Sequence, residues 1–254
     1  MLTIIIVVFA FLYIPISVLL ALSFNESGLP TAWSGFSVKW YGELFHNEDI
    51  IRATGNTLIV AVASTLLATL LGTLLAIGVE IRRRKGRFLE TIIFAPMIIP
   101  DIVLAIALLS FFSMLNVKMG LHTIIFSHVV FNLAFVCAVV RARLKSFDWS
   151  IVEASADLGA SLHTTLRRVV LPVLAPAVFA SSLLAFTLSV DEFIIAFFTA
   201  GAGRDSITLP MQIFSMIRFG VTPEINALST IVMTVSLVAL ALSQRLNRGE
   251  LPGQ

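Results

Sequence analysis

The chain has 254 residues, of which 58% are hydrophobic and only 13% are charged, and its mean hydropathy is +0.99. Soluble domains carry about 25% charged residues, and half of that charge cannot cover the surface of a water-soluble globule of this size. The composition therefore excludes a cytosolic enzyme and a secreted domain, and a net charge of +2 is too small to indicate a nucleic-acid binder.

Six apolar runs are long enough to cross a membrane, because a transmembrane helix needs about 20 apolar residues. In chain order, the predicted spans are 1–25, 53–79, 91–117, 119–140, 169–203 and 225–244. Asp191 and Glu192 interrupt the fifth span. The segment 206–217 is too short to span and contains Pro210, so we expect a loop or a surface helix there. The sequence thus predicts an all-α membrane protein with six transmembrane helices.

The positions of Lys and Arg predict the orientation of these spans. The loops after the second, fourth and sixth spans hold 12 of the 17 Lys and Arg residues. Loops rich in Lys and Arg remain in the cytoplasm, so both termini are predicted to be cytoplasmic. Ala21-Leu22-Ser23 resembles a signal-peptidase site. However, the first span has no basic n-region and exceeds the usual apolar length of about 7–15 residues, which favours an uncleaved anchor.

The second predicted span carries a stripe of small residues at intervals of four. The stripe consists of Ser64, Ala68, Gly72 and Ala76. Small side chains allow two helix backbones to approach closely in a membrane. The stripe therefore predicts tight packing, either inside the bundle or against a second subunit.

Three acidic residues, Asp101, Asp191 and Glu192, lie within predicted spans. A charge at the centre of a span costs about 2.5–3.5 kcal/mol on insertion scales, so it normally faces the bundle or a wet cavity. Asp101 follows Pro96 and Pro100 and lies roughly 18 Å from the cytoplasmic end, at 1.5 Å per residue. That places it near the midplane, with the other two acids nearer the outer end of a pathway.

No Lys or Arg lies deep in any predicted span, so these acids have no evident ion-pair partner. A cationic substrate would supply one, and Asp101, Asp191 and Glu192 are therefore the candidate substrate-pathway residues. The alternative is structural: a carboxyl group that is hydrogen-bonded to a neighbouring helix or held protonated.

The remaining side chains do not indicate chemistry within this chain. His122 and His128 do not have the spacing of zinc ligands, so we expect them in the core or in hydrogen bonds, and we expect His46 and His163 to be solvated. The sequence has no G-x-x-x-x-G-K-[ST] motif, so it cannot bind ATP through a P-loop. We expect no enzyme activity, metal or cofactor in this chain. A proton-coupled secondary transporter, with Asp101 as the relay, is an alternative, and an intramembrane hydrolase would lack its motifs.

The predicted cytoplasmic segment 141–172 is long but does not have the composition of a loop. Good helix formers predict one short helix over 151–158, which Gly159 would end. A second short helix is predicted over 162–170 and should stop before Pro172. Such a helix pair needs a surface to pack against, and a cytoplasmic protein is the simplest partner.

This segment matches a spacing known from transport proteins. It reads Glu153-Ala154-Ser155, three residues, Gly159, nine residues, Val169, one residue, Leu171-Pro172. It resembles the EAA loop of ABC importer permeases, EAA-x3-G-x9-I-x-L-P, with Ser155 and Val169 as conservative departures. The resemblance implies a coupling helix that docks into a groove on a cytoplasmic ATPase. The residues implied in that coupling are Glu153, Ala154, Asp157 and Gly159.

Other segments are similar to the permeases of spermidine/putrescine importers. They are Asn56-Thr57-Leu58, Pro100-Asp101-Ile102-Val103, Phe126-Ser127-His128, 186–192 and 220–227. The resemblance implies the type I (MetI-like) permease fold. It also implies a first helix and external loop over 1–52, a core transmembrane domain over 53–245 with the coupling loop at 141–172, and a cytoplasmic tail over 246–254.

The resemblance further implies the partners and the location. These are a homologous permease subunit, two copies of an ABC ATPase that bind ATP and Mg²⁺, an extracytoplasmic substrate-binding protein and membrane lipid, but no nucleic acid. The location would be the bacterial inner membrane, as a multi-pass protein. Related permeases carry opines, thiamine or ferric iron, so these substrates remain alternatives to a polyamine.

Overall fold

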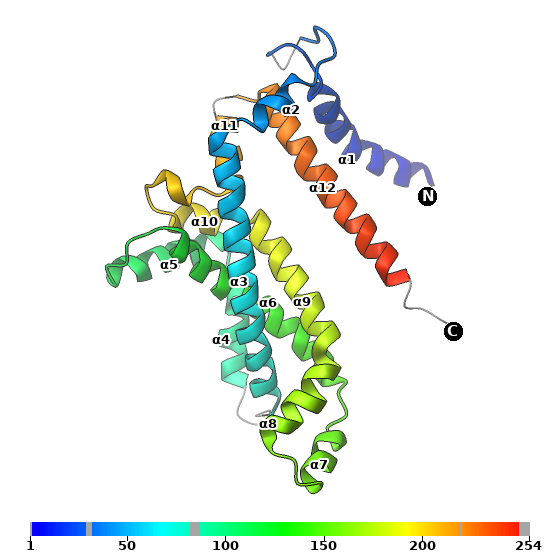
Figure 1. Ribbon diagram of the computed structural model, residues 1–254, viewed down its shortest axis with the longest axis vertical. Helices are drawn as coiled ribbons and strands as arrows, with labels where there is room; N and C mark the ends of the chain where they lie inside the picture. Colours follow the sequence, from blue (N-terminus) through cyan, green and yellow to red (C-terminus); the bar gives the residue numbers. More distant parts are fainter. Residues whose placement is uncertain (1, 29–31, 82–86, 219, 249–254) are drawn as a thin grey trace. The chain divides into compact units, whose positions relative to one another are not determined.

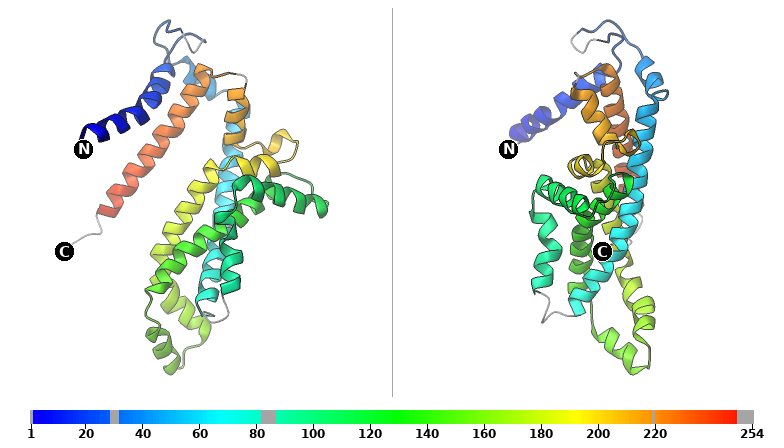
Figure 2. Two further views of the ribbon diagram at one scale, coloured as in Figure 1. Left: turned by 180° about the vertical axis from the view of Figure 1, so that it is seen from behind. Right: turned by 90° about the vertical axis from the view of Figure 1, so that its left-hand side faces the viewer.

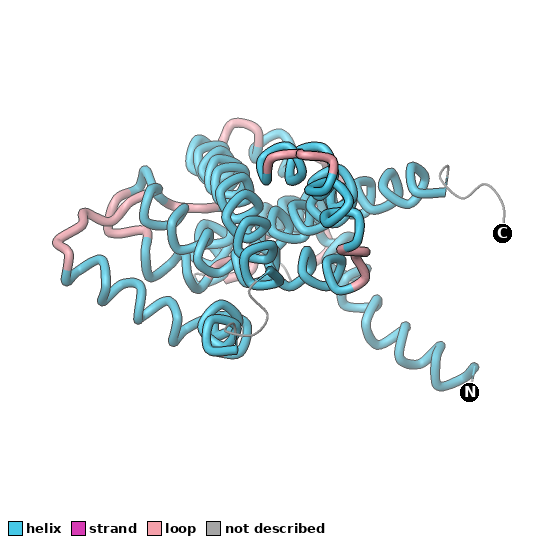
Figure 3. The backbone as a smooth tube through the Cα atoms, turned by 90° about the horizontal axis from the view of Figure 1, so that it is seen from below, coloured by secondary structure: helices cyan, strands magenta, loops and turns pink. Residues whose placement is uncertain are grey.

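The computed structural model describes residues 2–28, 32–81, 87–218 and 220–248, which leaves the basic cluster 82–85 and most of the predicted tail outside the described residues. All regular elements in these ranges are helices (Figures 1 and 3), and the only β-type pairing in them is one bridge between Asn25 and Phe36. The predicted all-α class is confirmed. The chain forms two compact units, residues 52–211 and residues 1–51 with 212–254.

The helices have the following bounds: α1 Leu2–Leu22, α2 Lys39–Leu44, α3 Glu48–Ile81, α4 Arg87–Ile98, α5 Asp101–Met114, α6 Leu121–Lys145, α7 Ser150–Asp157, α8 Leu162–Thr165, α9 Leu171–Asp191, α10 Ile194–Thr199, α11 Leu209–Arg218 and α12 Pro223–Arg248. A π-helical turn, Leu166–Val170, joins α8 to α9, and a 3₁₀ turn, Arg204–Ser206, precedes α11. The short helix α11 agrees with the surface helix expected near Pro210.

In the unit that holds both termini, α12 packs against α1 and α2. Asn47 stabilises the start of α3, since its side-chain oxygen accepts the N–H groups of Asp49 and Ile50 at 3.1 and 3.3 Å. Its amide nitrogen donates to Glu224 of α12 at 2.9 Å. The apolar residues of α1 are not buried within the chain. An apolar helix whose side chains stay exposed is suited to lipid or to another subunit.

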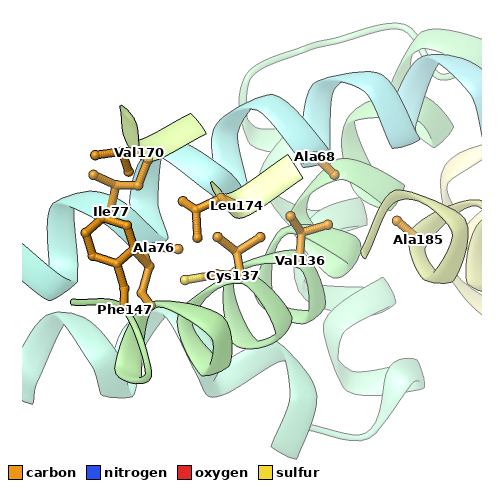
Figure 4. Packing of buried hydrophobic residues seen from close by; sticks show 11 residues of the cluster. Ala68, Ala76, Ile77, Val136, Cys137, Phe147, Val170, Leu174 and Ala185 are labelled. Carbon is orange, nitrogen blue, oxygen red and sulfur yellow. The ribbon is translucent and has the colours of Figure 1, made fainter. Parts of the chain in front are cut away.

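In the unit of residues 52–211, α3, α6 and α9 share the largest cluster of buried apolar side chains (Figure 4). The small residues of α3 form its face toward this cluster, and Ser64, Ala68 and Ala76 are fully buried. A Cβ atom at Gly72 would lie 2.8 Å from the side chain of Val136 on α6. The predicted tight packing is therefore confirmed, and it occurs inside the bundle.

The third predicted span, 91–117, is not one continuous helix. The structure has two helices there, α4 and α5, which bend by 115° at the break around Pro100 (Figure 2). Pro100 has no N–H group to donate to the preceding turn, and it disfavours helical geometry at Ile99. Within the described residues, four helices are long and apolar enough to cross a membrane, and α4 with α5 gives up to five.

The second helix of the 141–172 segment does not stop before Pro172, as the sequence predicts. The π-helical turn carries the chain from α8 into α9 without a break, and the N–H of Leu171 bonds to the carbonyl of Leu166. Pro172 occupies the second position of α9, and the wider π turn relieves the clash between a proline ring and the carbonyl four residues earlier. Because α6 also continues to Lys145, the non-spanning connection shrinks to 146–161.

Candidate functional site

The connection between α6 and α9 presents α7 as an exposed helix. No residue of α7 is buried, and Glu153, Ala154 and Asp157 are all exposed. Two apolar side chains next to it, Leu158 and Leu162, are 88% and 69% exposed. Apolar side chains held outward beside charged ones are typical of a protein-binding surface.

Both ends of α7 are stabilised by local hydrogen bonds. Asp148 accepts the N–H of Ser150 at 3.0 Å, and the hydrogen bonds from Ser150 lower the pKa of this carboxyl below its ordinary value. At the other end, Gly159 has φ +78°. Its N–H bonds to Ala156 and the next N–H bonds to Ser155, which is the Schellman arrangement. The prediction that Gly159 ends this helix is confirmed.

The exposed helix is also tied to the rest of its unit. The Ser155 hydroxyl lies 2.9 Å from the hydroxyl of Thr165, which is buried. Trp149 stacks edge-on against Phe147 at 5.2 Å between ring centroids. Beneath α7 lies a pocket of about 450 Å³ lined by Glu80, Ile81, Trp149, Val152, Glu153 and Leu162. α7 and the end of α3 therefore border the same pocket.

The candidate pathway acids lie together at two helix breaks. Asp101 is the half-buried first residue of α5, immediately after the bend. Asp191 is the exposed last residue of α9, and Glu192 follows it in the break before α10. Because α5 packs against α10, Glu192 lies within electrostatic range of both Asp101 and Asp191. The three acids are therefore near one another, and we refer to them as the acidic cluster; their depth in the membrane stays a prediction.

The three acids differ in their surroundings. One carboxylate oxygen of Glu192 accepts the N–H of Ile195 at 2.8 Å, which satisfies a free donor in the first turn of α10. Among the described residues, no Lys or Arg forms an ion pair with any of the three carboxylates. The cluster therefore concentrates negative charge, with Glu192 partly committed to a structural bond and Asp101 and Asp191 open to other partners.

The histidines divide as buried and exposed side chains. His128 is 1% exposed, and its Nδ1 lies 2.7 Å from the Ser189 hydroxyl, which is 3.0 Å from that of Ser64. The expected core role is confirmed for His128. His122 is exposed at the start of α6 and so does not lie in the core; a hydrogen-bonding role for it stays a prediction. The described residues hold no group of three or more metal-ligating side chains.

An ionic cluster at the other end of the bundle was not predicted from the sequence. Arg141, near the end of α6, bonds to Glu90 of α4, and its Nε lies 3.5 Å from Glu80 near the end of α3. Each residue borders a different predicted span, so the sequence offered the three charges but not their pairing. Glu80 also lines the pocket beneath α7.

Comparison with known proteins decides the family. Residues 68–249 match the model of the binding-protein-dependent transport system inner membrane component. The chain belongs to this family. It is 42% identical over 247 residues to the spermidine/putrescine transport system permease protein PotC of Escherichia coli K12, covering 97% of this chain and 93% of the relative. It is 40% identical over 236 residues to the putrescine transport system permease protein PotI of the same strain, covering 89% and 82%.

Among solved structures, a chain of the bacterial ABC transporter that imports the acidic polysaccharide alginate matches with a TM-score of 0.77. Its sequence identity is 16%, and the match covers 96% of this chain and 94% of that one. This likeness shows the fold. Family membership and fold together make the chain a multi-pass membrane protein and a permease of the ABC importer type.

Proposed function

We propose that this chain is the transmembrane permease subunit of an ATP-driven importer for spermidine or putrescine. Relatives named for these polyamines are 40–42% identical over most of the chain. Independent support comes from the cluster of Asp101, Asp191 and Glu192, because ammonium groups form strong charge-assisted hydrogen bonds with carboxylates. A cluster without a described cationic partner within the chain is suited to a cationic substrate.

The coupling role rests on one observation, the exposed α7 with both ends held by hydrogen bonds. In the proposed assembly, the chain pairs with a homologous permease subunit, sits on two ABC ATPases that bind ATP and Mg²⁺, and receives substrate from an extracytoplasmic binding protein. The ATPases would dock on α7, and their closure would move α7 together with the helices to which Ser155 and Trp149 tie it.

The proposed topology has six spans with both termini in the cytoplasm of a bacterial cell, in its inner membrane. α4 and α5 count as one broken span, and α12 coincides with the sixth apolar run. This orientation puts α7 on the cytoplasmic side, where the ATPases are. Broken helices mark substrate paths in transporters, which agrees with the position of Asp101 at the α4–α5 bend.

The test uses the protein purified with its partner subunits and reconstituted in proteoliposomes. It replaces Asp101 and Asp191, the two acids of the cluster that were described as open to other partners. Asp101→Asn and Asp191→Asn keep the volume of the side chain but remove its charge. Each should reduce uptake of labelled spermidine by roughly tenfold to a hundredfold, the loss of one charge-assisted contact. Basal ATP hydrolysis should persist. Asp205→Asn, an exposed acid outside the cluster, is the matched control and should transport normally.

Wild-type uptake in both variants, or stimulation only by an anionic substrate, would refute the cationic pathway. Competition with unlabelled putrescine, thiamine, an opine or ferric iron identifies the substrate. If the assembly imports one of the last three and does not import polyamines, the substrate assignment is wrong, while the permease role stands. Uptake driven by a proton gradient without ATP would instead establish a secondary transporter.

A further inference from the structure

We infer that Arg141 is a positioning residue that ties α3 and α4 to the end of α6 above the α7 pocket, and that this tie transmits movement of α7 to the α4–α5 break. The inference rests on the proposed coupling role of α7. It concerns residues outside the EAA-type motif and outside the acidic cluster.

The geometry joins three helices through one guanidinium group. Arg141 Nε lies 3.5 Å from Glu80 Oε2, and its Nη2 bonds to Glu90 Oε1. The guanidinium carbon lies 6.0 Å from the centroid of the Phe94 ring, also on α4. An arginine presents several donors in one plane, so it can hold two carboxylates at once. A lysine, as a single point charge on a flexible stem, cannot reproduce this geometry.

The ion pairs of Arg141 with Glu80 and Glu90 are partly buried, so they should contribute more to stability than an exposed ion pair does. The side chains of Glu80, Arg141 and Glu90 are 1%, 14% and 28% exposed. Exposed pairs contribute little because water screens them. Here the removal of Arg141 would take away the group that holds an almost fully buried carboxylate and a second, partly buried one, so α3 and α4 should separate from α6 at this end.

The cluster is connected to α7 on one side. Glu80 bonds with Arg141 and also lines the α7 pocket together with Trp149 and Glu153. Beyond Arg141, α6 leads directly into Phe147, whose ring packs on Trp149. A displacement of α7 would therefore change the pocket that Glu80 lines, and it would act on the end of α6 through Trp149 and Phe147.

On the other side the cluster is connected to the acids. Glu90 lies in the first turn of α4, and the same helix ends at the bend that carries Asp101. Arg141 holds α4 at Glu90 and lies beside Phe94, so a shift at this end displaces the helix that leads to the bend. Arg141 thus stands between α7 and the helix break, which no other described ion pair does.

The experiment measures spermidine imported per ATP hydrolysed in the reconstituted assembly. Arg141→Met should lower this ratio by roughly twofold to thirtyfold, the range found for residues that carry coupling between distant sites. Arg141→Lys should restore it only in part. The matched control is Arg143→Met, two residues along the same helix and exposed, which should leave the ratio unchanged. Glu90→Gln, a milder change at the more exposed carboxylate, keeps the test valid if Arg141→Met does not assemble.

A double variant supplies the decisive readout. If Arg141 acts through Glu90, Arg141→Met with Glu90→Gln should be no more uncoupled than Arg141→Met alone. An unchanged ratio in both single variants, or uptake and ATP hydrolysis that fall in parallel with thermal stability, would overturn the inference. These outcomes concern Arg141 alone: if the wild-type assembly couples ATP hydrolysis to spermidine uptake, the proposed function stands. If the wild-type assembly shows no such uptake, the proposed function itself is rejected.

Discussion

Replacement of Gly159 by alanine isolates the backbone conformation that ends α7. Gly159 has φ +78°, and an added Cβ would meet no atom within 4 Å. Any effect must therefore come from the backbone and not from a steric clash. A residue with a Cβ in the left-handed region costs about 1–2 kcal/mol, which lowers the population of the intact turn by roughly fivefold to thirtyfold.

The expected result is a loss of coupling with normal assembly. Gly159 lies in the connection between α6 and α8, outside the helices that could cross a membrane, so insertion should be unaffected. Without the Schellman turn, α7 can no longer present Glu153 in a fixed orientation. The assay compares spermidine uptake and ATP hydrolysis in proteoliposomes, and uptake should fall by up to roughly thirtyfold.

Two further variants sharpen this test. Gly159→Asn should retain most of the uptake, because asparagine tolerates the left-handed region. Gly78→Ala makes the same chemical change at another glycine whose Cβ would meet nothing, but within helix α3 and at ordinary φ, so it should transport normally. Normal coupling in Gly159→Ala, or equal losses in Gly159→Ala and Gly159→Asn, would refute the reasoning.

Two other predictions concern topology and packing. Single cysteines at Ser27 and Ser161, with Cys137 replaced, should react with a membrane-impermeant reagent in intact cells only at Ser27; labelling of both sites would reject the proposed orientation. Gly72→Ala should lower the free energy of unfolding of the detergent-solubilised protein by about 1–3 kcal/mol, and with it the melting temperature. The new Cβ would overlap the Val136 side chain on α6, and overpacking a core typically costs this much free energy. Equal melting temperatures for Gly72→Ala and the Gly78→Ala control would show that α3 and α6 are not held in close contact.

Features that depend on local hydrogen bonds were predictable from the sequence. The end of α7 at Gly159 needs only a residue that reaches the left-handed region and two backbone bonds within six residues. The small-residue stripe on α3 likewise predicted close packing. It did not identify α6 as the partner, because which helices pair depends on contacts far apart in the chain.

The ion pairs of Arg141 could not be predicted from the sequence, because the paired residues lie far apart in the chain. Glu80, Glu90 and Arg141 border three different apolar runs, and counting Lys and Arg by loop assigns Arg141 to the cytoplasmic surface. The structure shows instead an arginine side chain that is 14% exposed and lies between two carboxylates. A positive charge at the end of a span can thus serve the packing of the bundle as well as its orientation.

The α4–α5 bend is a feature that hydropathy alone does not predict. Hydropathy measures whether a segment prefers lipid, but it carries no information about the direction of the helix axis. The segment 91–117 was therefore predicted as one span. The prolines at 96 and 100 indicated a break, but they indicated neither the 115° bend nor the packing of α5 on α10, which puts Asp101 near the break that holds Glu192. The acidic cluster is therefore a product of two helix breaks, at Pro100 and at Glu192. A movement that changes either break would also change the distance between the acids. In the proposed pathway, a shift of α4, which Arg141 holds at its base, would therefore change how the acids bind a cationic substrate.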